Sequence, residues 1–134
     1  MNILLCTAEE LMLTTFEFRF RKNGWKLMVA ENAKLALEKT NSLMPDLVVV
    51  DLDLPDFEAL DIVQFIRKEA KTSDLPILTY GTVENEQLLL ESLRLGADDF
   101  VIAPVKPDEL TIRIRRQLIR KKKNYQPVAE GTGA

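Results

Sequence analysis

The residues best suited to chemistry are carboxylates that follow a short apolar run. Asp51 ends the run Leu47-Val48-Val49-Val50, and Asp53 lies two residues further on. An aspartate held at the rim of an apolar strand can act as a nucleophile or as a ligand of a divalent cation. The same carboxylate could instead cap a helix or close a turn. The local sequence leaves both interpretations of Asp51 open.

The composition excludes several other kinds of chemistry. The 134 residues include one cysteine and no histidine, which removes an internal disulfide, the usual zinc sites and every catalytic triad that needs histidine. Any metal site must therefore use carboxylates. The sequence has no apolar run of the roughly 18 residues that a membrane span needs, and its N-terminus lacks the pattern of a secretion signal. We expect one domain in the cytoplasm.

Short apolar runs alternate with segments of helical length. Buried strands are expected over residues 3–6, 26–30, 47–50, 75–79 and 100–102. Helices are expected between and after them, at residues 8–22, 32–43, 58–71, 83–95 and 106–122. This alternation predicts an α/β fold with a doubly wound parallel sheet and helices on both faces.

The segment over residues 8–22 fits two patterns. Phe16, Phe18 and Phe20 alternate with charged residues, as in a half-buried strand. Met12, Phe16 and Phe20 also follow the spacing of four that is typical of a helix face. A helix here preserves the alternation of strands and helices, so we favour the helix.

Charge is distributed unevenly along the chain. Residues 1–100 carry 10 Lys/Arg and 18 Asp/Glu, whereas residues 101–123 carry 8 and 2. The basic segment is interpreted as a solvated helix end. Direct nucleic-acid binding is disfavoured by the acidic remainder and by the lack of stacking aromatic residues beside the basic run. The domain is expected to span residues 1–122, with residues 123–134 as a flexible tail or truncated linker.

Several motifs occur in an order and at a spacing that resemble the receiver domain of bacterial two-component response regulators, over about residues 2–120. They are the segments 3–6, 23–25, 45–55 around Asp51, 75–78, 96–100, and Ala103-Pro104. The resemblance implies a flavodoxin-like fold with strand order 2-1-3-4-5. It also implies a module of the type attached to winged-helix DNA-binding domains.

By this resemblance, Asp51 is the position that a partner histidine kinase, or another signalling protein, would phosphorylate. In the family, acidic residues hold a divalent cation, and a Lys and a Ser/Thr bind the phosphoryl oxygens. The resemblance assigns Mg²⁺ here to Glu9, Asp51 and Asp53. Direct attack by the Asp51 carboxylate on phosphorus fits the chemistry of an activated nucleophile.

Several family positions are altered in this sequence. The acidic pair after the first strand falls on Ala8 and Glu9, the Ser/Thr position on Gly81, and the Lys position on Ala103. A phosphoryl group brings a charge of about −1.5 to −2 that needs polar partners. The side chains of Ala8, Gly81 and Ala103 supply none. We therefore expect weak Mg²⁺ binding, inefficient phosphorylation and a degenerate receiver, or pseudo-receiver. The expected phosphoryl pocket and switch positions are Gly81, Thr82, Phe100, Ala103 and Pro104.

The resemblance also suggests a surface for self-association. Receivers attached to winged-helix domains form two-fold dimers through the fourth helix, fifth strand and fifth helix, with acids and arginines paired across the axis. The matching residues are Arg94, Asp98, Asp99, Glu109, Arg113 and Arg115. An ordinary solvated helix face is the competing interpretation, because exposed ion pairs contribute only about 0–1 kcal/mol each.

An enzyme is the main alternative to a non-enzymatic signalling module. Asp51 and Asp53 also resemble the nucleophile and acid of haloacid-dehalogenase-type phosphatases, for which Asp98 and Asp99 would be a metal pair. The position of the motif on the third predicted strand disfavours this alternative.

Overall fold

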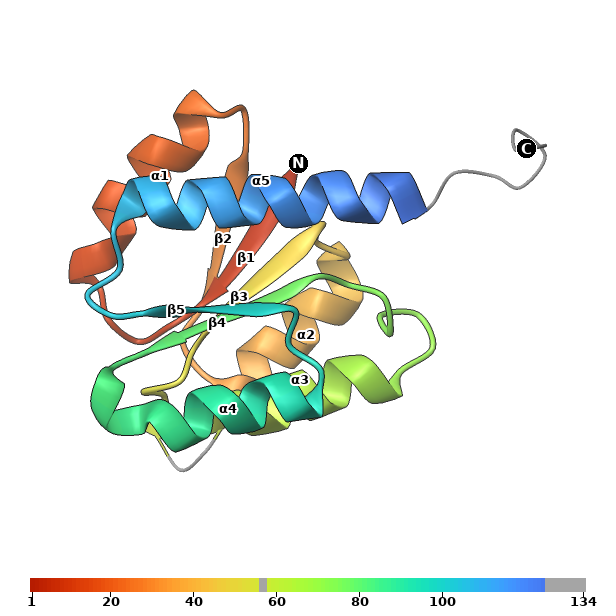
Figure 1. Cartoon of the computed structure of the whole chain (residues 1–134). Helices are drawn as coiled ribbons and strands as arrows, with labels where there is room; N and C mark the ends of the chain where they lie inside the picture. The colour runs from red at the N-terminus through yellow and green to blue at the C-terminus, as the bar shows by residue number, and fades with distance from the viewer. Residues whose placement is uncertain (56–57, 125–134) are drawn as a thin grey trace, which may run out of the picture.

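The sheet contains five parallel strands. The computed structural model describes residues 1–55 and 58–124 (Figure 1). The strands lie in the order β2-β1-β3-β4-β5, and all four pairings are parallel. Their bounds are β1 Asn2–Cys6, β2 Lys26–Ala30, β3 Leu47–Asp51, β4 Ile77–Gly81 and β5 Asp99–Ile102. The predicted fold class and strand order are confirmed.

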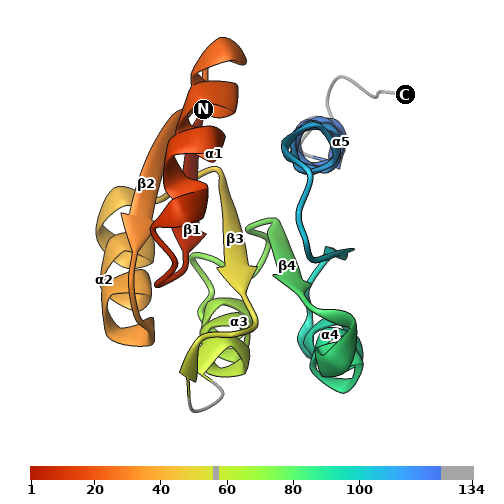
Figure 2. The ribbon, with the colours of Figure 1, turned by 90° about the vertical axis from the view of Figure 1, so that its left-hand side faces the viewer.

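Helices cover both faces of this sheet. They are α1 Leu11–Lys22, α2 Ala33–Leu43, α3 Glu58–Lys68, the short 3₁₀ helix η2 Val83–Asn85, α4 Glu86–Leu95 and α5 Pro107–Asn124. Figures 1 and 2 show α1 and α5 on one face and α2, α3 and α4 on the other. In the described part of the chain, no helix has both the length and the apolar character needed to cross a membrane.

The two faces of the sheet bury separate apolar clusters. Successive side chains of a strand point in opposite directions. In β3, Val48 and Val50 therefore join the cluster beneath α2, α3 and α4, whereas Leu47 and Val49 join the cluster beneath α1 and α5. All four are fully buried, as expected for a strand that is covered on both faces. Asp51 is consequently the first polar residue of β3 and lies at its carboxyl end.

The three phenylalanines of α1 resolve the ambiguity in that segment. Phe16 and Phe20 are buried and face the sheet, while Phe18 is exposed, as the spacing of four predicts for a helix. Asn23 ends the helix, and Gly24 follows with φ +76°. That left-handed conformation costs glycine less than other residues.

Several boundaries differ from the predictions by one to three residues; α1 begins at Leu11 and α3 ends at Lys68, each three residues inside its expected range. β4 begins at Ile77, two residues later than expected, and continues through Tyr80 to Gly81. Proline has no N–H to donate to a sheet ladder, so Pro76 lies just before the strand. α5 extends to Asn124, which places two residues of the expected tail in the helix. The remainder of that tail, residues 125–134, lies outside the described residues.

Candidate functional site

Thr7, Asp51 and Tyr80 form a row at the carboxyl edge of the sheet. Asp51 is the register partner of Tyr80, and Thr7 directly follows Cys6, the partner of Val50. Register partners in neighbouring strands point to the same face, so this row faces the side covered by α1 and α5. The parallel strands thus bring together residues that are distant in the sequence.

Both oxygens of the Asp51 carboxylate are engaged. The Thr7 hydroxyl donates to Oδ2 at 2.7 Å, and the Asp53 backbone N–H donates to Oδ1 at 2.8 Å. Asp51 is only 4% exposed. Burial raises its pKa above the ordinary value, and these two hydrogen bonds oppose the shift. The predicted position at the end of β3 is confirmed, but the carboxylate is covered rather than open to a pocket.

Tyr80 places a phenol beside this carboxylate. Its hydroxyl is buried and has no hydrogen-bond partner within the described residues. Burial, and then the negative charge of Asp51, raise the pKa of Tyr80 above its ordinary value. Tyr80 is therefore a neutral donor next to a buried acid.

The predicted magnesium ligands do not form a site that fits Mg²⁺. Glu9 is exposed, and its contribution to the cluster is a backbone N–H that donates to Thr7 Oγ1 at 3.1 Å. The Asp53 carboxylate accepts from the Asn85 amide at 2.6 Å. Across residues 1–55 and 58–124, no three acidic, cysteine or histidine side chains are grouped to hold a metal ion. Thr7, rather than a second acid, occupies the place beside Asp51.

The positions expected to bind phosphoryl oxygens carry little polar chemistry. Gly81 is buried at the end of β4, and its carbonyl accepts from the Ala103 N–H at 2.7 Å. Thr82 follows, half-buried. The next loop contains Ala103 and an exposed Pro104. Neither Gly81 nor Ala103 supplies the hydroxyl or ammonium group that would neutralise an added phosphoryl charge.

Phe100 serves as packing in this structure. It lies in β5 as the register partner of Thr79, and its half-buried ring packs against the cluster under α2, α3 and α4. Gly81 provides no hydroxyl that could draw the ring inward.

Asp99 organises most of the charge on β5 and α5. It accepts from Arg113 at 2.8 Å and from Arg116 at 2.9 Å, and Arg113 also pairs with Glu109 at 3.3 Å. Hydrogen bonding to Asp99 raises the pKa of Arg113. Arg94 pairs with Glu91 on α4. These charges are thus matched within one chain.

Two residues predicted for this face lie elsewhere. Arg115 hydrogen-bonds Asn23 and lies over the Trp25 ring at 6.0 Å, so it faces α1 and β2. Its one-residue offset from Arg116 turns it by about 100° around the helix. Asp98 accepts from Arg67 of α3 at 2.9 Å and from the Ile77 N–H at 2.8 Å.

The alternative phosphatase metal pair is also separated from Asp51. Asp98 and Asp99 lie beside the starting residues of β4, whereas Asp51 lies at the opposite, carboxyl edge. The two ends of parallel strands are spaced by their length, so these acids do not converge on the candidate nucleophile.

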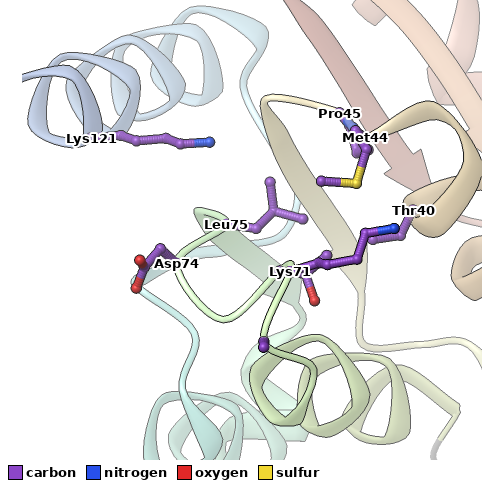
Figure 3. A pocket seen from close by; sticks show the side chains of 9 residues that line it. Thr40, Met44, Pro45, Lys71, Asp74, Leu75 and Lys121 are labelled. Atoms are coloured by element: carbon purple, nitrogen blue, oxygen red, sulfur yellow. The ribbon is translucent and has the colours of Figure 1, made fainter. Parts of the chain in front are cut away.

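A cavity of about 160 Å³ opens at the amino-terminal edge of the sheet, away from Asp51 (Figure 3). It lies between the end of α2, the segment before β4 and the end of α5. Met44, Pro45 and Leu75 line its apolar part, and Lys71 and Lys121 carry its cations. It is remote from Asp51 and belongs to a different part of the fold.

Three contributors to the site were not singled out from the sequence. They are Thr7, Tyr80 and Asn85. The end of the first apolar run could have indicated Thr7, since in-register strands place residue 7 opposite residue 51. Asn85 carried no such signal, because its partner Asp53 is 32 residues away.

The family of the chain follows from this fold and from its sequence. Residues 3–115 match the model of the response regulator receiver domain. This match covers most of the chain, which therefore belongs to the receiver domain family of two-component response regulators. Membership in this family does not favour the phosphatase alternative.

Two curated relatives match over most of this chain. The alkaline phosphatase synthesis transcriptional regulatory protein PhoP of Bacillus subtilis (strain 168) is 27% identical over 129 residues, covering 96% of this chain and 52% of the relative. The probable transcriptional regulator ycf27 of Galdieria sulphuraria is 34% identical over 124 residues, covering 92% and 48%. The chain therefore spans about half the length of these curated relatives.

A solved structure confirms the fold independently. A crystal structure of a putative response regulator from Chloroflexus aurantiacus J-10-fl superposes with a TM-score of 0.82 at 23% identity, covering 88% of this chain and 97% of that one.

Proposed function

We propose that this receiver domain signals largely through protein–protein interaction, with Asp51 as a phosphoacceptor-equivalent residue that is not efficiently phosphorylated. The observation that carries the proposal is the state of the Asp51 carboxylate, which is buried and accepts hydrogen bonds with both oxygens. An attacking carboxylate must present a free oxygen to phosphorus. Asp51 is only 4% exposed, so a phosphodonor has little access to either of its oxygens.

The surroundings of Asp51 add to this barrier. A transferring phosphoryl group is stabilised mainly by positioned cations and hydrogen-bond donors. Ala8, Gly81 and Ala103 contribute no such side-chain group. We accordingly expect Mg²⁺ to bind weakly at most.

Intact-mass measurement with a small phosphodonor tests the proposal. The wild-type domain, incubated with phosphoramidate and Mg²⁺, should show no mass increase of about 80 Da, the mass of one phosphoryl group. The matched variant Ala8→Asp with Gly81→Ser and Ala103→Lys restores an acid, a hydroxyl and an ammonium group, and should gain the increase. Adding Asp51→Asn to this variant should abolish it. A wild-type increase that Asp51→Asn removes would contradict the proposal.

The face formed by α4, β5 and α5 is the surface we propose for interaction. Leu90, Ile102 and Ile112 are exposed there, Leu90 by 53% and Ile112 by 60%. Apolar side chains of this kind supply the affinity that matched surface ion pairs do not. A second copy of the chain is one occupant, and a histidine kinase or another signalling protein is the other. The site of action we propose is the cytoplasm, as is typical of response regulators.

A further inference from the structure

A hydrogen-bond tie joins the loop after β3 to the start of α4. Asp53 Oδ1 accepts from Asn85 Nδ2 at 2.6 Å, and the Asp53 backbone N–H donates to Asp51 Oδ1 at 2.8 Å. Asp53 thus contacts the acceptor-equivalent carboxylate with its backbone and α4 with its side chain. Asp53 lies in the loop after β3 and Asn85 lies at the end of η2, 32 residues apart in the sequence, so local geometry does not force the contact.

The side chain of Asn85 donates to Asp53 and does not cap its own helix. It is the N-cap of α4, where asparagine ordinarily accepts a hydrogen bond from a backbone N–H of the first turn. Asn32 does so at α2, where its side chain accepts from the Leu35 N–H at 2.9 Å. Asn85 makes no side-chain cap. The Glu86 N–H donates instead to the Val83 carbonyl of η2, and the side chain of Asn85 joins this segment to Asp53.

A second polar contact fixes the middle of α4. The hydroxyls of Thr79 in β4 and Ser92 in α4 lie 2.9 Å apart and are fully buried. Ser92 also donates to the Leu89 carbonyl at 2.7 Å. This buried contact joins the middle of α4 to the sheet, whereas the contact between Asn85 and Asp53 joins its start to the loop after β3.

We propose that Asp53 is a positioning residue that holds the first turn of α4, next to the exposed Leu90, in one orientation without a phosphoryl group at Asp51. This inference rests on the proposed function, in which the outer face of α4 is an interaction surface. The hydrogen bond between Asp53 and Asn85 then positions α4 in place of a phosphorylated Asp51.

Local hydrogen exchange of the whole chain tests the tie. Asp53→Ala and Asn85→Ala should each raise the exchange rates of the amides at residues 86–89 about threefold to tenfold, the factor that the net strength of one hydrogen bond supplies. The double variant should add nothing to either single change. Asp53→Asn retains an acceptor oxygen and should stay close to wild type. Glu84→Ala is the matched control, because Glu84 is an exposed neighbour of Asn85.

Three readings decide the question. Urea unfolding should give the same midpoint for Asp53→Ala and the control. A purely structural role would change both the exchange rates at residues 86–89 and the unfolding midpoint. Equal exchange in Asp53→Ala and Glu84→Ala, or independent and additive effects at residues 53 and 85, would overturn the inference. The measurement uses unmodified protein without a phosphodonor. A mass increase in the phosphoramidate experiment would thus refute the proposed function while leaving this test intact.

Discussion

Replacing Thr7 with valine removes the hydroxyl that donates to Asp51 while keeping the shape of the side chain. The bond is 2.7 Å long and joins two buried residues, so solvent cannot replace it. A hydrogen bond to a charged group contributes about 1.5–3 kcal/mol. For a domain of this size, we expect the unfolding temperature to fall by about 6–12 °C.

This penalty should depend on pH. The Thr7 hydroxyl favours the ionised form of Asp51 and so lowers its pKa relative to burial alone. The penalty of Thr7→Val should therefore be largest at neutral pH, where the carboxylate is charged, and should shrink as the pH falls and the carboxyl group binds a proton.

Urea unfolding at neutral and mildly acidic pH measures both effects. Thr72→Val is the matched control, because Thr72 is equally buried and donates to a neutral acceptor, the Ile66 carbonyl, at 2.7 Å. It should cost about 1 kcal/mol at either pH. If Thr7→Val costs no more than Thr72→Val, or costs the same at both pH values, the reasoning about Asp51 is refuted.

Three other changes test separate features. Burial raises the pKa of Asp51, so the folded state binds this proton more readily than the unfolded chain, and stability is lost as the pH rises. Asp51→Asn should therefore be more stable than the wild type in urea titrations at neutral pH. The difference in stability between the two proteins should shrink in acid. Gly96 has φ +124°, and an added Cβ would lie 2.7 Å from Arg67 Cγ, so Gly96→Ala should cost about 1–3 kcal/mol in thermal unfolding. Ile112→Asp should reduce self-association in sedimentation velocity, whereas Phe18→Asp, equally exposed on α1, should not; equal effects would place the contact elsewhere.

The fold could be predicted because the sequence repeats one strong signal. The run at residues 47–50 is apolar on both faces of the strand, and the spacing of Leu110, Ile114 and Leu118 marks one buried side of α5. Such periodicity depends on local residues alone. The bounds of β4 are harder to predict from the sequence, since Leu75 and Pro76 extend the apolar run without joining the strand.

The site could be predicted only in part. Asp51 follows directly from the end of its strand, but its partners depend on the register between strands. A shift of one residue reverses the face of every side chain, so a match that assigns the acidic pair to Ala8 and Glu9 misses Thr7, the residue that contacts Asp51. The bond between Asp53 and Asn85 joins the loop after β3 to the end of η2. Its formation depends on loop conformations that no periodic pattern encodes.

The sharing of Asp99 between Arg113 and Arg116 has a consequence for how quickly partners associate. Long-range attraction accelerates encounter when one surface presents an excess of charge. In the ion pairs of this face, Glu91, Asp99 and Glu109 meet Arg94, Arg113 and Arg116, three charges of each sign. An approaching molecule therefore experiences a weak field from them. Association should then proceed at an unassisted rate, and added salt should alter it little.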